Sequence, residues 1–127
     1  MKKNGGVVQT VAFSAYINTE KDKKYKDELV TKMEALATVQ GVALVPRRAI
    51  RKLKGAAKEA AIAVYMKLSK EVKMDMKLSE FPPVNVADFV DHIDYLVEKM
   101  GIEHVGISSD FDGGGGVDGW NDASETL

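Results

Sequence analysis

Hydrophobic and polar positions change their spacing several times along the chain, and each change marks the end of a predicted element. After the turn signal Gly5-Gly6, residues 7–17 are mostly apolar and rich in β-branched and aromatic types. Such a run is typical of a parallel strand covered on both faces. From Thr19 apolar residues recur every three or four positions, which predicts a helix that Gly41 ends. Its buried face is expected to contain Tyr25, Leu29, Met33 and Leu36.

Pro46 is expected to open a second, longer helix, because Pro is favoured at the first helical position. An apolar stripe at helical spacing supports it. The stripe consists of Ile50, Leu53, Ala57, Ala60, Val64 and Leu68. The chain becomes polar after Lys70, and the sequence Phe81-Pro82-Pro83 cannot continue a helix, so this region is expected to be a connector.

A third helix is predicted with Asn85 as its N-cap and Asp88 completing an approximate capping box. Gly101 ends it. The expected buried face consists of Phe89, Ile93, Leu96 and Met100. Residues 104–109 then predict a short second strand, which leads into a loop of glycines and aspartates at residues 110–120.

The order strand, helices, strand is a βαβ crossover with an enlarged helical insertion, which indicates an α/β fold. We therefore expect residues 7–13 and 104–109 to be neighbouring parallel strands. Two strands leave two open edges, so the unit is expected to belong to a larger sheet or barrel, or to form oligomers or domain-swapped pairs.

The amino-acid composition excludes several classes of protein but does not identify the function. The 127 residues are 45% hydrophobic, enough to bury a core, and 18 basic residues balance 19 acidic ones. The net charge is therefore too small to create an electrostatic field that would attract nucleic acid or an anionic membrane. There are no cysteines, which excludes disulfides and thiolate metal sites but leaves localisation open. The start of the chain imitates a short signal peptide, but Gln9, Thr10 and Ser14 interrupt its apolar run, and no run is long enough for a membrane span.

Candidate chemistry concentrates in the loop after the second strand, since α/β proteins bind ligands beyond the carboxyl ends of their strands. Asp110 is the first residue past that strand, and from position alone it is either catalytic or a turn residue. The glycines match G-x-G-x-x-G by spacing, but no helix pattern follows them, which argues against a dinucleotide site. A calcium loop starting at Asp110 and Asp112 would have Gly114 and Asn121 where ligands are needed.

Histidines and cations elsewhere favour structural roles. His92 and His104 are too far apart for a metal-binding spacing, so no metal site is expected within this chain. Five cations lie within eight residues, from Arg47 to Lys54. They could contact phosphates, as in a nucleic-acid-binding protein, but without interleaved aromatics an exposed helix start is the favoured interpretation.

Three segments together resemble the membrane dipeptidase family, the family of the renal dipeptidase. They are Val-Ala-Asp-Phe-Val-Asp-His-Ile-Asp-Tyr at 86–95, Val-Gly-Ile-Ser-Ser-Asp-Phe-Asp-Gly at 105–113, and Gly-Trp-Asn-Asp at 119–122. The opening Lys-Asn-Gly-Gly-Val-Val-Gln at 3–9 is similar to the family's seventh strand and the turn before it. Residues 21–78 resemble only loosely the longer insertion of some bacterial members.

The resemblance implies a (β/α)8 barrel that holds two zinc ions and hydrolyses dipeptides by means of a metal-activated water. This chain would supply strands seven and eight as a C-terminal segment of that barrel. Asp110 matches the aspartate that orients the attacking water and passes its proton to the leaving amine. Tyr16 matches a tyrosine of the substrate pocket, although it is equally explained as an aromatic at the barrel rim. Asp112 is expected to fix the loop.

The family's metal ligands have no counterpart in this sequence, so the isolated chain is expected to be inactive and to hold no zinc. The alternative hypothesis is a non-catalytic binding or scaffold module derived from the barrel. Dipeptides are the expected partner of the full-length enzyme, whereas nucleic acid is not expected to be one.

Overall fold

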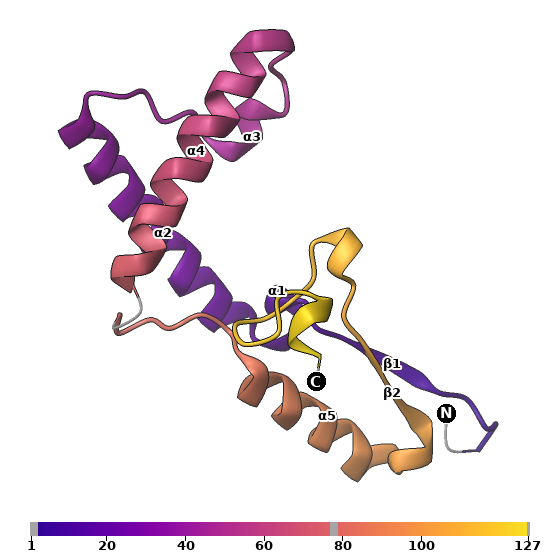
Figure 1. Ribbon diagram of the computed structural model, residues 1–127. Coiled ribbons are helices and arrows are strands. Elements are labelled where there is room, and N and C mark those ends of the chain that lie inside the picture. The colour runs from indigo at the N-terminus through magenta and orange to yellow at the C-terminus, as the bar shows by residue number, and fades with distance from the viewer. Residues whose placement is uncertain (1–2, 77–78, 127) are drawn as a thin grey trace. The chain divides into compact units, whose positions relative to one another are not determined.

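Two short parallel strands form the sheet of the computed structural model, which describes residues 3–76 and 79–126 (Figure 1). Strand β1 (Val8–Val11) pairs with β2 (Val105–Ser108) in a register that joins Val8 to Val105 and Val11 to Ser108. The expectation of neighbouring parallel strands from the two ends of the chain is therefore confirmed.

The first strand is shorter than predicted. A strand over residues 7–17 was expected, but pairing ends at Val11, and α1 (Ser14–Ile17) is helical. The last ladder bond runs from Ala12 N–H to the Ser108 carbonyl, at 2.9 Å. After Ser108 the chain leaves the sheet. The residues that follow Val11 therefore have no strand beside them to continue the ladder. The apolar character of Ile17 reflects packing against the core.

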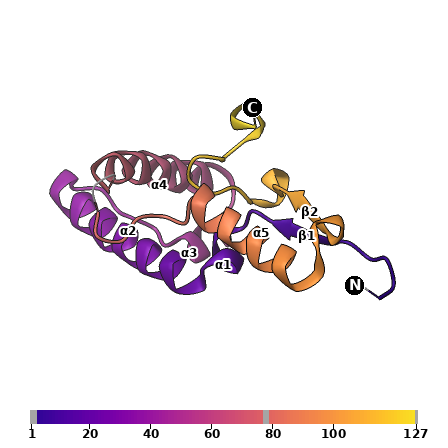
Figure 2. The ribbon, with the colours of Figure 1, turned by 90° about the horizontal axis from the view of Figure 1, so that it is seen from below.

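Helix α5 (Val86–Met100) follows the predicted cap and contacts β2 (Figures 1 and 2). The Asn85 side chain accepts from the Asp88 N–H at 3.1 Å, and the Asp88 carboxylate accepts from the Asn85 N–H at 2.8 Å. The capping box is thus confirmed. Of the predicted face only Phe89 is fully buried, and it packs in a core with Ala12, Val84 and Val117. The short turn η2 (Ile102–His104) joins α5 to β2.

The chain divides into two compact units, one of Met1–Lys23 with Pro83–Leu127 and one of Lys24–Pro82. The second unit covers most of the range expected of the insertion, 21–78. It contains most of α2 (Thr19–Gln40), which ends before Gly41 as predicted, and all of α4 (Gly55–Asp75). The core of this unit consists of Leu29, Met33, Ala37, Leu68, Val72 and Met76.

The helix predicted from Pro46 is broken in the structure. Residues 47–50 form α3 (Arg47–Ile50), and α4 begins only at Gly55, where φ is +54°. Val64 and Leu68 of the predicted stripe pack in the core, but Ala57 and Ala60 are exposed and Ala61 is buried instead. Helix α4 also continues to Asp75, beyond the point where a polar connector was expected. Among the helices of the described residues, none is long and apolar enough to cross a membrane.

Candidate active site

The loop after β2 folds back onto the segment that follows β1 (Figure 1). Hydrogen bonds therefore join the two segments beyond the carboxyl ends of the strands. The Gly116 N–H donates to the Ala12 carbonyl at 2.6 Å, and Phe13 and Gly116 form a parallel bridge. The Ser14 hydroxyl adds a bond to the Gly116 carbonyl at 3.4 Å. This is where the sequence predicted ligand chemistry.

Asp110 has a left-handed backbone, with φ 54° and ψ 35°, and it precedes the short turn η3 (Phe111–Gly113). A residue with a Cβ adopts this conformation at a cost of about 1 kcal/mol or more, so the surrounding structure must impose it. The Asp110 carbonyl accepts two N–H groups, from Gly113 at 3.0 Å and Gly115 at 2.7 Å. Asp110 itself is exposed.

The glycines of this loop allow the chain to pass close to Asp110. A Cβ added to Gly113 would lie 2.5 Å from the Asp110 Oδ1 atom, and one added to Gly115 would press on the Ser109 and Asp110 carbonyls. The N–H groups of residues 113–116 all donate to carbonyls of the loop or of Ala12. Each of these N–H groups therefore already has a carbonyl partner within the protein.

The far end of the loop is fixed to the start of α5. Val117 and Trp120 form two backbone hydrogen bonds, of 3.1 and 2.9 Å, around Gly119, which has φ +87°.

Asp118 attaches this turn to the residues before α5. The Asp118 N–H donates to the Val84 carbonyl and the Asp118 carbonyl accepts from the Val86 N–H, at 3.0 and 3.1 Å. The segment around Asn85 thus holds the loop in place.

Two interactions at this end could not be predicted from spacing. The Trp120 ring stacks on Phe89 with centroids 5.7 Å apart and makes a T-shaped contact with Phe111 with centroids 5.2 Å apart. The Lys21 ammonium lies 2.5 Å from the Asp88 carboxylate. Partial burial raises the pKa of Asp88, but the hydrogen bonds from Lys21 and the Asn85 N–H outweigh it and lower that pKa below the usual aspartate value.

Tyr16, the predicted substrate-pocket residue, lies on α1 beyond the carboxyl end of β1 and is 74% exposed. Its ring packs against Phe13 with centroids 4.8 Å apart. The structure therefore places Tyr16 and Asp110 after neighbouring strands, although among the described residues neither side chain hydrogen-bonds to the other.

The histidines lie away from the Asp110 loop. His104 Nδ1 is 2.8 Å from the Gly6 carbonyl and joins the start of β2 to the turn before β1. His92 is half-buried on α5. Within residues 3–76 and 79–126, no group of three or more His, Cys, Asp or Glu side chains could hold a metal ion. These residues by themselves do not fit the two zinc ions that the family resemblance implies.

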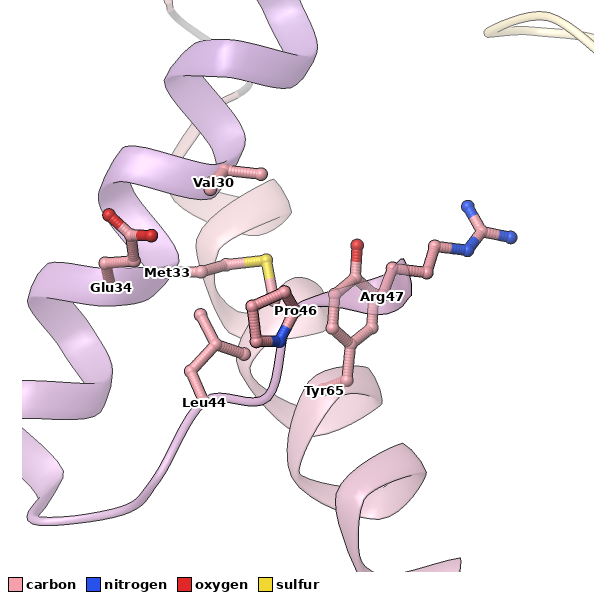
Figure 3. A pocket seen from close by; sticks show the side chains of 7 residues that line it. All are labelled: Val30, Met33, Glu34, Leu44, Pro46, Arg47 and Tyr65. Carbon is pink, nitrogen blue, oxygen red and sulfur yellow. The ribbon is translucent and has the colours of Figure 1, made fainter. Parts of the chain in front are cut away.

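The second unit has a small pocket of about 120 Å³ (Figure 3). Its lining is mainly apolar and consists of Val30, Met33, Leu44, Pro46 and Tyr65, with Glu34 and Arg47 at its edge. The Arg47 guanidinium points away from the other lining side chains, so the pocket lacks the converging polar groups of an active site. The five cations of residues 47–54 are exposed on α3 and the link before α4, instead of on the first turns of one long helix.

The sequence matches the family model described as membrane dipeptidase, peptidase family M19, over residues 1–126. The chain belongs to this family. The resemblance carried by the Asp110 strand end and by α5 is thereby confirmed. A search of curated proteins found no match.

Among solved structures, the chain is similar to the probable dipeptidase PvdM from Pseudomonas aeruginosa. The two sequences are 34% identical, the match covers 98% of this chain and 30% of PvdM, and the TM-score is 0.47. This membrane dipeptidase family chain thus spans about 30% of the length of that relative.

Proposed function

We propose that this chain supplies part of the active site of a dipeptidase, with Asp110 as its acid–base residue. The observation that carries the proposal is the accessible carboxylate of Asp110, held in a left-handed turn directly beyond the carboxyl end of β2. Family membership supports the reaction. We further propose that β1 and β2 are strands seven and eight of a (β/α)8 barrel, whose active site would lie at this end of the strands.

Hydrolysis of a dipeptide needs a group that first accepts a proton and then donates it. The oxygen of a water molecule attacks the peptide carbonyl carbon, the carbon–nitrogen bond breaks, and a proton from the water must reach the leaving nitrogen. A carboxylate can accept that proton and then donate it, provided that its position relative to both atoms is fixed. The turn around Asp110 provides such fixation through its two carbonyl hydrogen bonds.

Tyr16 is proposed to line the substrate pocket. An exposed aromatic ring beyond a neighbouring strand, supported from one side by Phe13, can pack against an apolar substrate side chain. The zinc ions of the family, which lower the pKa of a bound water, would be held by residues elsewhere in the complete enzyme. The isolated chain is therefore expected to be inactive.

The test is Asp110→Asn in the complete, zinc-replete protein, with Asp112→Asn as the matched control. Asn keeps the size of Asp and tolerates the left-handed backbone, so folding should be preserved while the base is lost. Turnover of a dipeptide should fall by ~10² to 10⁴-fold in Asp110→Asn, and far less in Asp112→Asn. In the same assay Tyr16→Ala should raise KM more than it lowers kcat.

Hydrolysis near the wild-type rate in Asp110→Asn, with normal zinc content, would refute the catalytic role. Asp110 would then be a turn residue, and its substitution would change stability by ~1 kcal/mol without changing the turnover of the folded protein. A complete protein that binds dipeptides without hydrolysing them would favour the alternative, a non-catalytic binding module.

A further inference from the structure

The residue that follows Asp110 is held by an aromatic contact. Phe111 is half-buried, and its ring and that of Trp120 form a T-shaped contact, with a centroid distance of 5.2 Å and an interplanar angle of 73°. After Asp112 the rest of the turn is glycine: Gly113 to Gly116 follow without interruption, and Gly114 and Gly116 have positive φ. Glycines allow many backbone conformations, so the two hydrogen bonds to the Asp110 carbonyl need a further contact to fix the direction of the Asp110 side chain.

Trp120 is itself firmly placed. The two backbone bonds between Val117 and Trp120 form a closed turn, and Val117 is 2% exposed in the core. The indole stacks on Phe89, which is 4% exposed and lies in the first turn of α5. Its Nε1–H donates to the Thr126 hydroxyl at 2.8 Å. The indole thus joins the helix start to the residue beside Asp110.

We infer that Trp120 is a positioning residue for Asp110, because its indole braces Phe111 against Phe89 and so fixes the turn that presents the carboxylate. This inference rests on the proposed catalytic role of Asp110. Without the indole, Phe111 loses the edge contact and the glycine-rich turn can shift. A displacement of about 1 Å at a reacting group can reduce a rate by ~10²-fold, so the effect should be on turnover.

The experiment is a double-mutant cycle in the complete, zinc-replete protein, with Trp120→Leu and Asp110→Asn made singly and together. Leu keeps an apolar side chain against Phe89 but cannot offer an aromatic ring to Phe111. In the wild-type background Trp120→Leu should lower kcat by ~10 to 10²-fold with KM nearly unchanged. In the Asp110→Asn background it should lower kcat by less than about threefold, because residues that act through one group are not additive.

Two further variants separate positioning from folding. Trp120→Phe retains a ring that can reach both neighbours and should restore most of the activity. Phe111→Leu leaves the stack of Trp120 on Phe89 intact and should show the same loss of kcat and the same non-additivity with Asp110→Asn. This variant carries the test if Trp120→Leu does not fold. As the control, Tyr95→Leu removes an exposed aromatic ring of α5 and should leave kcat unchanged.

The outcomes distinguish the two proposals. If Asp110→Asn hydrolyses the dipeptide at the wild-type rate, the proposed function fails. If Asp110→Asn is slow but Trp120→Leu and Phe111→Leu reduce kcat equally in both backgrounds, or not at all, only the positioning role of Trp120 is overturned.

Discussion

Backbone conformation at single residues accounts for both the exposed carboxylate of Asp110 and the break between α3 and α4. Both Asp110 and Gly55 have φ of 54°. At Asp110 the cost of a left-handed backbone is offset by hydrogen bonds from Gly113 and Gly115 to its carbonyl. At Gly55 the absence of a Cβ removes that cost. The same dihedral therefore has a different physical basis at the two sites.

Gly55→Ala tests the helix break by the sign of its effect on stability. No atom lies within 4 Å of a Cβ added at Gly55, so the substitution changes only the backbone energy. With φ at +54°, we expect the free energy of unfolding to fall by about 1 kcal/mol, as measured by urea denaturation followed by circular dichroism. Gly55→Asn should cost less, since Asn tolerates this region. If residues 47–75 were one continuous helix, Gly55→Ala would instead raise the stability by about 1 kcal/mol.

At the scale of elements, the start of α5 connects several parts of the first unit. Asn85 and Asp88 cap the helix, Lys21 pairs with Asp88, and Asp118 is held by Val84 and Val86 on either side of Asn85. The carboxylate of Asp88 accepts from both the Lys21 ammonium and the Asn85 N–H. Its ionised form therefore stabilises the helix start and, through it, the loop that carries Asp110.

The pH dependence of stability should reveal this role of Asp88. Its pKa is lowered in the folded state, so the ionised carboxylate stabilises the fold above the unfolded aspartate pKa of about 3.9. That contribution is lost as the pH falls through the lower folded pKa. Asp88→Ala should therefore reduce the free energy of unfolding by about 1 kcal/mol at pH 7, and by progressively less as the pH falls below about 3.9.

Asp91→Ala is the matched control, because Asp91 is exposed on the same helix. It should leave both the stability and its pH dependence close to those of the wild type. Lys21→Met should remove part of the pH dependence while keeping the capping box. A constant difference between wild type and Asp88→Ala from pH 7 to pH 2 would contradict the stabilising role of the ionised carboxylate.

Elements with a strong local signal could be predicted from the sequence. The cap of α5 could be, because Asn85 and Asp88 have a characteristic spacing, and so could the pairing of β1 with β2, because both strands are bounded by turn residues. The break at Gly55 could not be predicted, because a glycine within a helical pattern can have either positive or negative φ and the sequence does not show which. The strand end at Val11 depends on where the partner strand stops, which lies almost a hundred residues away along the chain.

At the scale of the molecule, the candidate site combines residues from both ends of the sequence. The position of Asp110 after a strand could be predicted, and its family resemblance suggested its role. The bracing of Phe111 by Trp120 and Phe89 could not be predicted, because aromatic contacts across a glycine-rich loop follow from turn geometry and have no periodic signature. The exposure of Ile107 in the sheet could not be predicted either, because it depends on the three-dimensional structure.

The sheet predicts how the 127-residue chain behaves alone. In the described part of the chain β1 and β2 each have one unpaired edge, and Ile107 of β2 is 64% exposed. Open strand edges beside exposed apolar side chains favour self-association. We expect light scattering with size-exclusion chromatography to show oligomers whose proportion rises with concentration. Ile107→Lys should weaken association by ~10 to 10²-fold, because burying an isoleucine contributes about 1.5–3 kcal/mol.

Ile102→Lys provides the comparison that separates association through the sheet from non-specific hydrophobic association. Ile102 is 76% exposed but lies in η2, outside the strands. Its substitution adds the same charge and removes the same apolar side chain, so an equal loss of association would mean that the sheet has no special part in it. A folded monomer at every concentration would contradict the prediction altogether. Under the barrel proposal, the rest of the barrel covers Ile107 in the complete protein, where Ile107→Lys should reduce stability instead of changing the oligomeric state.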